Sequence, residues 1–196
     1  MSKLVILEGA RGTGKSTAAF KLRQLTKSST LINFTGFHDD GKEGLQKIKD
    51  YYYNWFQLLR NMKWKVKDQL IICDRFFPSE MVYSTLYKDY DFTSTYNMLC
   101  MELSTLADEV ILLNFTINDE NELSQRLIRD KVPFGKAEEN VKETMRQQDL
   151  YKHSIKQLQN ISSQYFRDKS VKVIDIDTTG KTIDEIVEMS LNEINR

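Results

Sequence analysis

Short apolar runs alternate along this chain with longer segments whose apolar residues recur at helical spacing. The first run, residues 4–7, is stopped by Glu8 and Gly9, which is typical of a buried strand. Four more runs predict strands of similar length, at residues 30–34, 69–73, 109–115 and 171–176. Because helices separate the strands, the pattern indicates a parallel sheet covered by helices on both faces.

The intervening segments predict helices from their spacing and from their end signals. We expect these helices at residues 16–25, about 44–62, from 78, about 95–106, 119–130, across 141–165 and from 182 to about 194. In the first of them, Phe20, Leu22 and Leu25 are the expected core contacts. Two residue pairs have the spacing of a helix cap and its partner, namely Asp119 with Glu122 and Thr182 with Glu185.

Length and composition fit a single globular domain spanning residues 1–196. Hydrophobic residues make up 40% of the chain and charged residues 29%, and no apolar run approaches the length of a membrane span. The 28 Lys and Arg residues balance 28 Asp and Glu residues, so neither a nucleic acid polymer nor a membrane is an expected partner. The first predicted strand leaves no room for a targeting segment, so we expect a cytoplasmic location.

A glycine-rich segment between the first predicted strand and the first predicted helix matches the pattern GxxxxGK[ST] in full. Glycines allow backbone N–H groups to curl around an anion, and the start of a helix adds unpaired amides and a positive dipole end. Lys15 would supply a charge to the outer phosphates of ATP, and the Ser16 hydroxyl is a ligand for Mg²⁺. A glycine-rich turn before an ordinary helix is the alternative, but the flanking strand and helix favour a phosphate site. The predicted ATP contacts in this loop are Gly9, Ala10, Arg11, Gly12, Thr13, Gly14, Lys15, Ser16 and Thr17.

A second polar pair follows the third predicted strand, with Asp74 at the end of the apolar run and Arg75 directly after it. If this strand lies beside the first, Asp74 comes close to Ser16 and holds Mg²⁺ directly or through water. The forked cation of Arg75 then projects beyond the strand, where it suits a phosphate group. A solvent-exposed strand end is the alternative, and the phosphate loop makes the site the better interpretation.

These motifs, in this order, resemble the thymidylate kinase group of nucleotide kinases, above all its small virus-type members and the related deoxynucleoside kinases. The resemblance rests on the phosphate loop, on Asp74-Arg75-Phe76 after an apolar strand, on Ser79-Glu80-x-Val82-Tyr83, and on residues 173–179 before the capped last helix. It implies a three-layer α/β sandwich of the P-loop NTPase type. The implied sheet has five parallel strands in the order 2-3-1-4-5, and a small lid lies near residues 130–140.

The resemblance also implies a reaction, in which ATP and a deoxynucleoside monophosphate give ADP and a diphosphate, with Mg²⁺ as cofactor. Arg75 would hold the acceptor phosphate, and Asp177 with Thr178 would belong to the loop beside the adenine of ATP. The full set of expected acceptor contacts is Glu8, Arg75, Phe76, Tyr83, Tyr52 and Phe56. The aromatic members would stack on the base or approach the sugar. Small-molecule nucleotides are thus the expected partners. The resemblance to the family also implies a homodimer formed through helices.

Two features depart from the family pattern, and both concern the acceptor. Thymidylate kinases usually carry an aspartate in the phosphate loop that contacts the acceptor sugar, and Arg11 stands in its place here. Residues 35–40 also lack the family's Arg-Glu-Pro run. The donor half of the site therefore follows the family more closely than the acceptor half does.

Cations near the predicted lid are candidates for stabilising the charge that develops during phosphoryl transfer. Arg126 and Arg129 lie on the helix before the lid, and Arg11 in the phosphate loop is a third candidate. A solvated basic face is the alternative for the two helical arginines. We expect at least one of the three to be catalytic, together with Lys15 and Arg75.

Three functions stay open on the sequence alone. A nucleoside monophosphate kinase needs cations for its acceptor and no strong general base, which fits Arg11 and Arg75. A deoxynucleoside kinase would benefit from a carboxylate base, for which Glu8, Asp39 and Asp40 are candidates. A nucleotide-binding switch that hydrolyses ATP slowly is the third. We favour the first.

Overall fold

The sheet stands at the centre of the computed structural model, which describes residues 2–34, 39–65, 68–129, 137–165 and 171–196. The described residues form five parallel strands in the order β2-β3-β1-β4-β5, which confirms the predicted order. The strands are β1 (Lys3–Gly9), β2 (Ser29–Asn33), β3 (Leu70–Asp74), β4 (Glu109–Thr116) and β5 (Lys172–Asp177). Each overlaps its predicted apolar run.

Helices connect the strands, as the spacing of apolar residues indicates. They are α1 (Lys15–Leu25), α2 (Gly41–Lys65), α3 (Phe77–Tyr87), α4 (Thr93–Glu102), α5 (Glu120–Arg129), α6 (Ala137–Tyr165) and α7 (Ile183–Asn195). The helix predicted at about 95–106 is shorter than expected, because Leu103–Thr105 continues it as a 3₁₀ turn. Most of the predicted lid, residues 130–136, lies outside the described residues.

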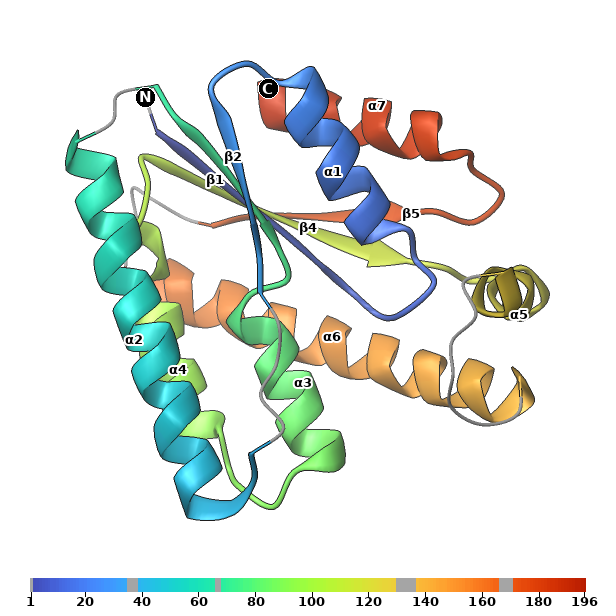
Figure 1. Cartoon of the computed structure of the whole chain (residues 1–196), viewed down its shortest axis with the longest axis horizontal. Helices are drawn as coiled ribbons and strands as arrows, with labels where there is room; N and C mark the ends of the chain where they lie inside the picture. Colours follow the sequence, from blue (N-terminus) through green and yellow to red (C-terminus); the bar gives the residue numbers. More distant parts are fainter. Residues whose placement is uncertain (1, 35–38, 66–67, 130–136, 166–170) are drawn as a thin grey trace.

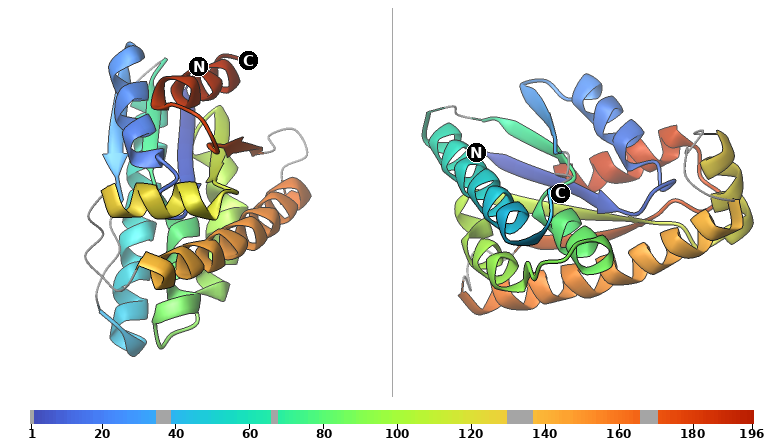
Figure 2. Two further views of the ribbon diagram at one scale, coloured as in Figure 1. Left: turned by 90° about the vertical axis from the view of Figure 1, so that its right-hand side faces the viewer. Right: turned by 60° about the horizontal axis from the view of Figure 1, so that its bottom comes forward.

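Two layers of helices enclose the sheet (Figures 1 and 2). α1 and α7 cover one face, and α2, α3, α4 and α6 cover the other. Side chains of β1 alternate between the two cores, so that Leu4 and Ile6 belong to the layer with α2 and α6, whereas Val5 and Leu7 belong to the layer with α1 and α7. The chain thus forms the three-layer sandwich that its pattern predicts.

The buried face of α1 differs from the prediction. Ala18, Ala19 and Leu22 are buried against the sheet, whereas Phe20 and Leu25 are exposed. Residues four apart share a helix face, so Ala18 and Leu22 point to the sheet together and Phe20 points away. The prediction is confirmed for Leu22 and wrong for Phe20 and Leu25, because it gave weight to large apolar residues and small alanines make the close helix–sheet contact here.

The two predicted caps have different outcomes. At α7 the capping box is confirmed, because Thr182 and Glu185 exchange hydrogen bonds between side chain and backbone. At α5, Asp119 accepts hydrogen bonds from the N–H groups of residues 121 and 122, at 2.8 and 3.1 Å. The side chain of Glu122 does not return to this cap, since it binds Arg126 and the N–H of Gly180.

The carboxyl ends of the strands meet at one edge of the sheet, where ligands of such folds bind. The phosphate loop begins there at the end of β1, and the register aligns Leu7 of β1 with Asp74 of β3 and Asp74 with Asn33 of β2. α5 lies beyond the end of β4 at the same edge (Figure 1). No helix in the described part of the chain has the length and apolarity that crossing a bilayer requires.

Candidate functional site

The phosphate loop leaves β1 and returns into α1 through glycines that no other residue replaces easily. Gly9 has φ +140°, and a Cβ there would lie 2.4 Å from the carbonyl oxygen of Phe115. Gly14 is the N-cap of α1 with φ 80°, and the first turn of α1 contains no acidic residue. The Thr13 hydroxyl donates to the Ala10 carbonyl at 2.9 Å, inside the loop. The loop is therefore internally fixed, and it presents the positive end of α1 without a competing side-chain anion.

Lys15 is the first residue of α1, and its side chain is buried among other charged groups. Burial lowers the pKa of Lys15 to about 7, and the nearby positive charge of Arg75 acts in the same direction. Asp74 and Glu8 oppose this shift. Without an anion, the ammonium group is thus held in an environment that disfavours its charge.

Nucleotide binding should consequently take up a proton at Lys15. A phosphate beside the amine favours the charged form, so it raises the pKa of Lys15 above the value of about 7 that holds without a nucleotide. At a pH between the pKa of Lys15 without nucleotide and its pKa with nucleotide bound, binding is accompanied by uptake of up to about one proton. In this range the affinity for the nucleotide falls as the pH rises. Calorimetric titration with a non-hydrolysable ATP analogue at about pH 8, in buffers of different ionisation enthalpy, measures this uptake.

The matched variant for that experiment is Lys15→Arg, whose guanidinium stays charged at every pH used. Any binding that this variant retains should occur without the proton uptake. Equal uptake in both proteins would locate the proton elsewhere and contradict the role of Lys15.

Asp74 is the candidate carboxylate ligand for a metal ion beside the loop. Its carboxylate is buried, and among the described residues no hydrogen bond satisfies the buried oxygen Oδ1. A buried carboxylate oxygen without a partner is costly, so a ligand for it is expected. Ser16 is exposed and lines the same cavity, so that a hydroxyl and a carboxylate face one space. Both are oxygen ligands that suit Mg²⁺.

Replacing Asp74 with asparagine should raise the Mg²⁺ concentration needed for half-maximal activity by about 10-fold or more. The amide keeps the size of the side chain and removes its charge. Asp175→Asn is a suitable control, because Asp175 lies on β5 and binds the amide of Asn114. Titration of activity with Mg²⁺ checks the result, and an unchanged Mg²⁺ requirement would exclude Asp74 as a metal-holding residue.

A cavity of about 670 Å³ extends from Ser16 and Asp74 along α3. Cations line it near the phosphate loop, aromatic rings line its walls, and charged groups line it near the end of α3. The cavity is lined by Arg11, Ser16, Asn33, Phe34, Asp40, Tyr52, Asp74, Arg75, Phe76, Ser79, Glu80, Tyr83, Tyr87 and Lys88. We call it the acceptor cavity.

Arg75 is held in this cavity by neutral partners. Its backbone has φ 68°, a region that side-chain-bearing residues rarely adopt. One guanidinium nitrogen, Nη1, donates to the hydroxyls of Tyr151 at 3.1 Å and Ser79 at 3.4 Å. The guanidinium carbon lies 5.5 Å from the ring centre of Tyr83. The described residues form no salt bridge with Arg75, so its charge is available to an anion.

Glu8 lies beneath the acceptor cavity rather than in its wall. Its Oε1 accepts from the Phe76 N–H at 2.8 Å, and its Oε2 accepts from the Ser79 hydroxyl at 2.6 Å. Burial raises the pKa of Glu8 to about 7 against these hydrogen bonds and the nearby charge of Arg75. The structure thus places Glu8 behind the residues that line the cavity, and its expected contact with the acceptor stays a prediction. The carboxylate supports the residues that line the cavity.

The aromatic residues expected at the acceptor divide into two groups. Phe76, Tyr83 and Tyr52 line the acceptor cavity. Phe56 does not, because it is 1% exposed and stacks behind Phe76 with ring centres 5.5 Å apart. The spacing of aromatic residues on one helix cannot separate a cavity wall from the packing behind it, and contact of these residues with an acceptor stays a prediction.

A polar cluster that joins Glu80 in the first turn of α3 to Lys88 and Tyr90 after the helix was missed as such. The buried Glu80 accepts from the Tyr90 hydroxyl at 2.5 Å and from Lys88 Nζ at 3.0 Å, through the same carboxylate oxygen. Glu80 and Lys88 both line the acceptor cavity. A donor and an acceptor side by side suit the edge of a nucleobase. Their closeness in the sequence was the available signal, but Glu80 alone is explained equally well as a first-turn acid.

A second cavity, also of about 670 Å³, adjoins the other residues of the phosphate loop. Its lining combines the loop, α5 and the start of α7, and consists of Gly12, Gly14, Thr17, Glu122, Gln125, Arg126, Arg129, Lys181, Thr182, Ile183 and Ile186. We call it the donor cavity. Residues of the loop thus separate two cavities of similar size.

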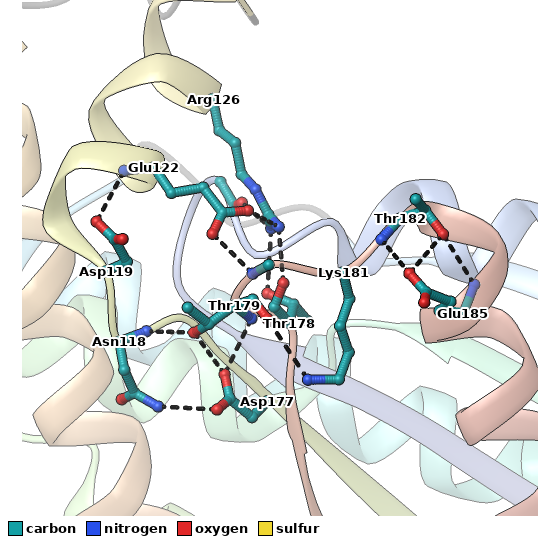
Figure 3. Close-up of polar contacts among 12 residues, drawn as sticks. Asn118, Asp119, Glu122, Arg126, Asp177, Thr178, Thr179, Lys181, Thr182 and Glu185 are labelled. Carbon is teal, nitrogen blue, oxygen red and sulfur yellow. Dashed lines mark hydrogen bonds and ion pairs between the residues drawn. The ribbon is translucent and has the colours of Figure 1, made fainter.

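Arg126 connects α5 to the phosphate loop and to the segment before α7 by hydrogen bonds (Figure 3). Its guanidinium donates to the Gly12 carbonyl at 3.2 Å, to the Thr178 carbonyl at 2.7 Å and to the Thr178 hydroxyl at 3.1 Å. Glu122 accepts from Arg126 at 2.5 Å and also from the N–H of Gly180 at 2.8 Å. The guanidinium is therefore engaged in holding α5 against the phosphate loop and the segment before α7.

The loop after β5 contributes to the donor cavity through residues other than those predicted. Thr178 is buried and bonds to the Thr116 carbonyl, and Asp177 accepts from Thr179 and Asn118. Neither Asp177 nor Thr178 lines the cavity, and their expected contact with ATP stays a prediction. Both shape the loop that brings Lys181 to the cavity wall.

The three candidate catalytic arginines line two different cavities. Arg11 lines the acceptor cavity with Ser16 and Arg75, whereas Arg126 and Arg129 line the donor cavity. Arg11 is therefore the candidate that lies with the groups predicted to act on the transferred phosphoryl group. Two further cations of the predicted lid, Lys131 and Lys136, lie outside the residues whose side chains the structure describes.

Comparison with solved structures identifies proteins of similar fold. The YorR protein from Bacillus subtilis, solved in complex with phosphorylated GDP, matches with 20% identity, 98% of this chain and 95% of its own covered, and a TM-score of 0.67. Thymidylate kinase from Ehrlichia chaffeensis matches with 14% identity, 98% of each chain covered and a TM-score of 0.51. Deoxyadenosine kinase from M. mycoides with bound dCTP matches with 16% identity, 100% and 99% coverage and a TM-score of 0.51. No family model matches the chain, and no curated protein does. The shared feature is the fold.

Proposed function

We propose that this chain is an ATP-dependent kinase that transfers the γ-phosphoryl group to a deoxynucleoside monophosphate. The observation that carries the proposal is the pair of cavities at one phosphate loop. Ser16 of the loop lines the acceptor cavity, and Gly12, Gly14 and Thr17 line the donor cavity. Two ligands bound in these cavities would meet at the loop, which is the positioning that phosphoryl transfer requires.

Proteins of the same fold support this proposal at the level of a nucleotide kinase. Two of them are named as thymidylate kinase and deoxyadenosine kinase, and a third was solved with phosphorylated GDP. Their identity with this chain is between 14% and 20%, so the acceptor is argued from this chain's own residues.

Each charged group of the site has a distinct part in the proposed reaction. The N–H groups at the start of α1 and the Lys15 ammonium hold the donor phosphates. Ser16 and Asp74 would hold Mg²⁺, which neutralises charge on the phosphate oxygens when bound. Arg75 binds the acceptor phosphate from the opposite side, and Arg11 adds a second cation in the same cavity. These groups together stabilise the charge that spreads over the transferred phosphoryl group.

The carboxylates of the site favour a phosphate acceptor over a hydroxyl acceptor. A hydroxyl needs a general base within hydrogen-bond reach. Glu8 is buried with both oxygens occupied, and Asp39 forms an ion pair with Lys47. Asp40 lines the acceptor cavity, and its Oδ1 accepts from the N–H groups of Gly41 and Asp89. The described residue that ends β2 beside Asp74 is the amide Asn33, which is no base.

A phosphoryl-transfer panel tests the proposed function. ATP and Mg²⁺ are offered with each deoxynucleoside and each deoxynucleoside monophosphate, and products are separated by anion-exchange chromatography. We expect diphosphate products from one or a few monophosphates and none from nucleosides. Products from nucleosides alone would contradict the proposed acceptor. Hydrolysis that ignores every acceptor would contradict a kinase and support a nucleotide-dependent switch.

A further inference from the structure

Tyr151 connects the long helix α6 to the acceptor side of the site, although no motif in the sequence identifies it. The side chain is fully buried at the middle of α6. Its hydroxyl lies 3.1 Å from Nη1 of Arg75 and 2.8 Å from the hydroxyl of Ser79. Tyr151 is not part of the cavity wall, so it touches Arg75 without touching the space for the acceptor.

The hydrogen bonds among these groups have one consistent direction. A guanidinium only donates, so the Tyr151 oxygen accepts from Arg75. Ser79 donates to Oε2 of Glu8 at 2.6 Å, which leaves its oxygen to accept the Tyr151 proton. The second oxygen of Glu8 accepts from the Phe76 N–H. The series runs from Arg75 through Tyr151 and Ser79 to a buried carboxylate, and every step has a donor and an acceptor.

This arrangement leaves the charge of Arg75 available while restricting its position. The carboxylate that balances it lies one hydroxyl group away, at Glu8, rather than in a direct salt bridge. A direct carboxylate partner would compete with an incoming phosphate for the same N–H groups. A flexible arginine side chain would in turn lose affinity through the entropy of ordering it on binding. Hydroxyl partners avoid both losses.

We propose that Tyr151 is a positioning residue for the acceptor phosphate, acting through Arg75. The inference rests on the proposed function, in which Arg75 binds that phosphate. Tyr151 orients the guanidinium toward the cavity, and Ser79 with Glu8 orients the Tyr151 hydroxyl. The residue thus affects the acceptor half of the site and leaves the donor half unchanged.

Tyr151→Phe tests this role, with Tyr96→Phe as the matched control. Tyr96 is equally buried and its hydroxyl also bonds to α6, through the Ser154 carbonyl at 2.6 Å, but it does not contact Arg75. In steady-state assays of the accepted monophosphate, Tyr151→Phe should lower kcat/KM for the acceptor by about 10-fold to 100-fold, as expected for a lost hydrogen bond to a charged group. The KM for ATP should change less than about 3-fold. Tyr96→Phe should leave both parameters near the wild-type values.

A double-variant cycle separates positioning from general packing. In an Arg75→Ala background the Tyr151 hydroxyl has no guanidinium to orient, so Tyr151→Phe should lower the remaining activity less than about 2-fold. Thermal melting verifies that each variant is folded. If Tyr151→Phe does not fold, Ser79→Ala interrupts the same series and should show the same acceptor-specific loss.

Three results would overturn the inference: wild-type acceptor kinetics in Tyr151→Phe, equal losses for acceptor and ATP, or the same loss with and without Arg75. Absence of transfer by the wild-type protein would instead mean that the proposed function fails. In that case, titration with inorganic phosphate still decides the positioning role. Tyr151→Phe should weaken phosphate binding by about 10-fold if the role is correct, and unchanged binding would end it.

Discussion

Replacing Lys15 with alanine is expected to abolish measurable phosphoryl transfer, since the substitution removes the cation that we propose acts on the donor phosphates. Loss of one such group costs several kcal/mol in the transition state, or a factor of about 10² or more in kcat. The amine is buried at the start of α1, within the phosphate loop motif, whereas the described lysines that line the two cavities, Lys88 and Lys181, come from other segments. A coupled assay with the preferred acceptor measures the loss.

The stability of the Lys15 variant distinguishes this effect from misfolding. The folded-state pKa of Lys15, about 7, lies below its ordinary value of 10.5, so holding the charged amine in the fold costs stability at and below neutral pH. Its removal should therefore leave the melting temperature unchanged or raise it. Lys21→Ala on the same helix is the control, because Lys21 forms an exposed ion pair with Asp184. Retention of more than about a tenth of the activity by the Lys15 variant would contradict the assignment.

Replacing Arg75 with alanine lowers kcat/KM for the acceptor by about 10²-fold to 10³-fold, because a preorganised cation is removed from the acceptor phosphate. Binding of ATP should weaken less than about 3-fold, since the donor cavity does not include Arg75. Arg75→Lys should restore only part of the loss, because an ammonium lacks the fork that binds two phosphate oxygens and meets both hydroxyls. Steady-state kinetics with varied acceptor and with varied ATP measure the effects on the acceptor side and on the donor side separately.

Arg60→Ala provides the control for that series. Its guanidinium pairs with Glu102 and bonds to the Thr105 hydroxyl, on a helix side away from both cavities. It should leave both kcat/KM values near the wild type. Wild-type acceptor kinetics in Arg75→Ala would show that the acceptor phosphate binds elsewhere.

The features predicted correctly from sequence are those set by local pattern. Strands follow from short apolar runs, and the strand order follows the family that the loop and Asp74-Arg75 resemble. The loop conformation is encoded in its own glycines, because positive φ and close backbone approach require them at Gly9 and Gly14. The conformation of the phosphate loop could therefore be predicted because it is set within one segment.

Other parts of the site depend on contacts between distant segments, which sequence reasoning did not identify. Tyr151 and Arg75 are 76 positions apart, and their contact follows from how α6 packs under the sheet edge. Phe56 and Phe76 likewise differ in exposure only because one stacks behind the other. Asp177 looked like a nucleotide contact but bonds within its own loop, a competition that Asp and Thr side chains enter readily.

The central claim is that the phosphate loop binds a nucleoside triphosphate, and titration of the folded protein with ATP and Mg²⁺ tests it most directly. We predict saturable binding at one site per chain, weakened by about 10²-fold or more in Lys15→Ala and changed little in Arg75→Ala. Absence of binding by wild-type protein with a normal melting transition would contradict the claim, as would equal affinity in the Lys15 variant.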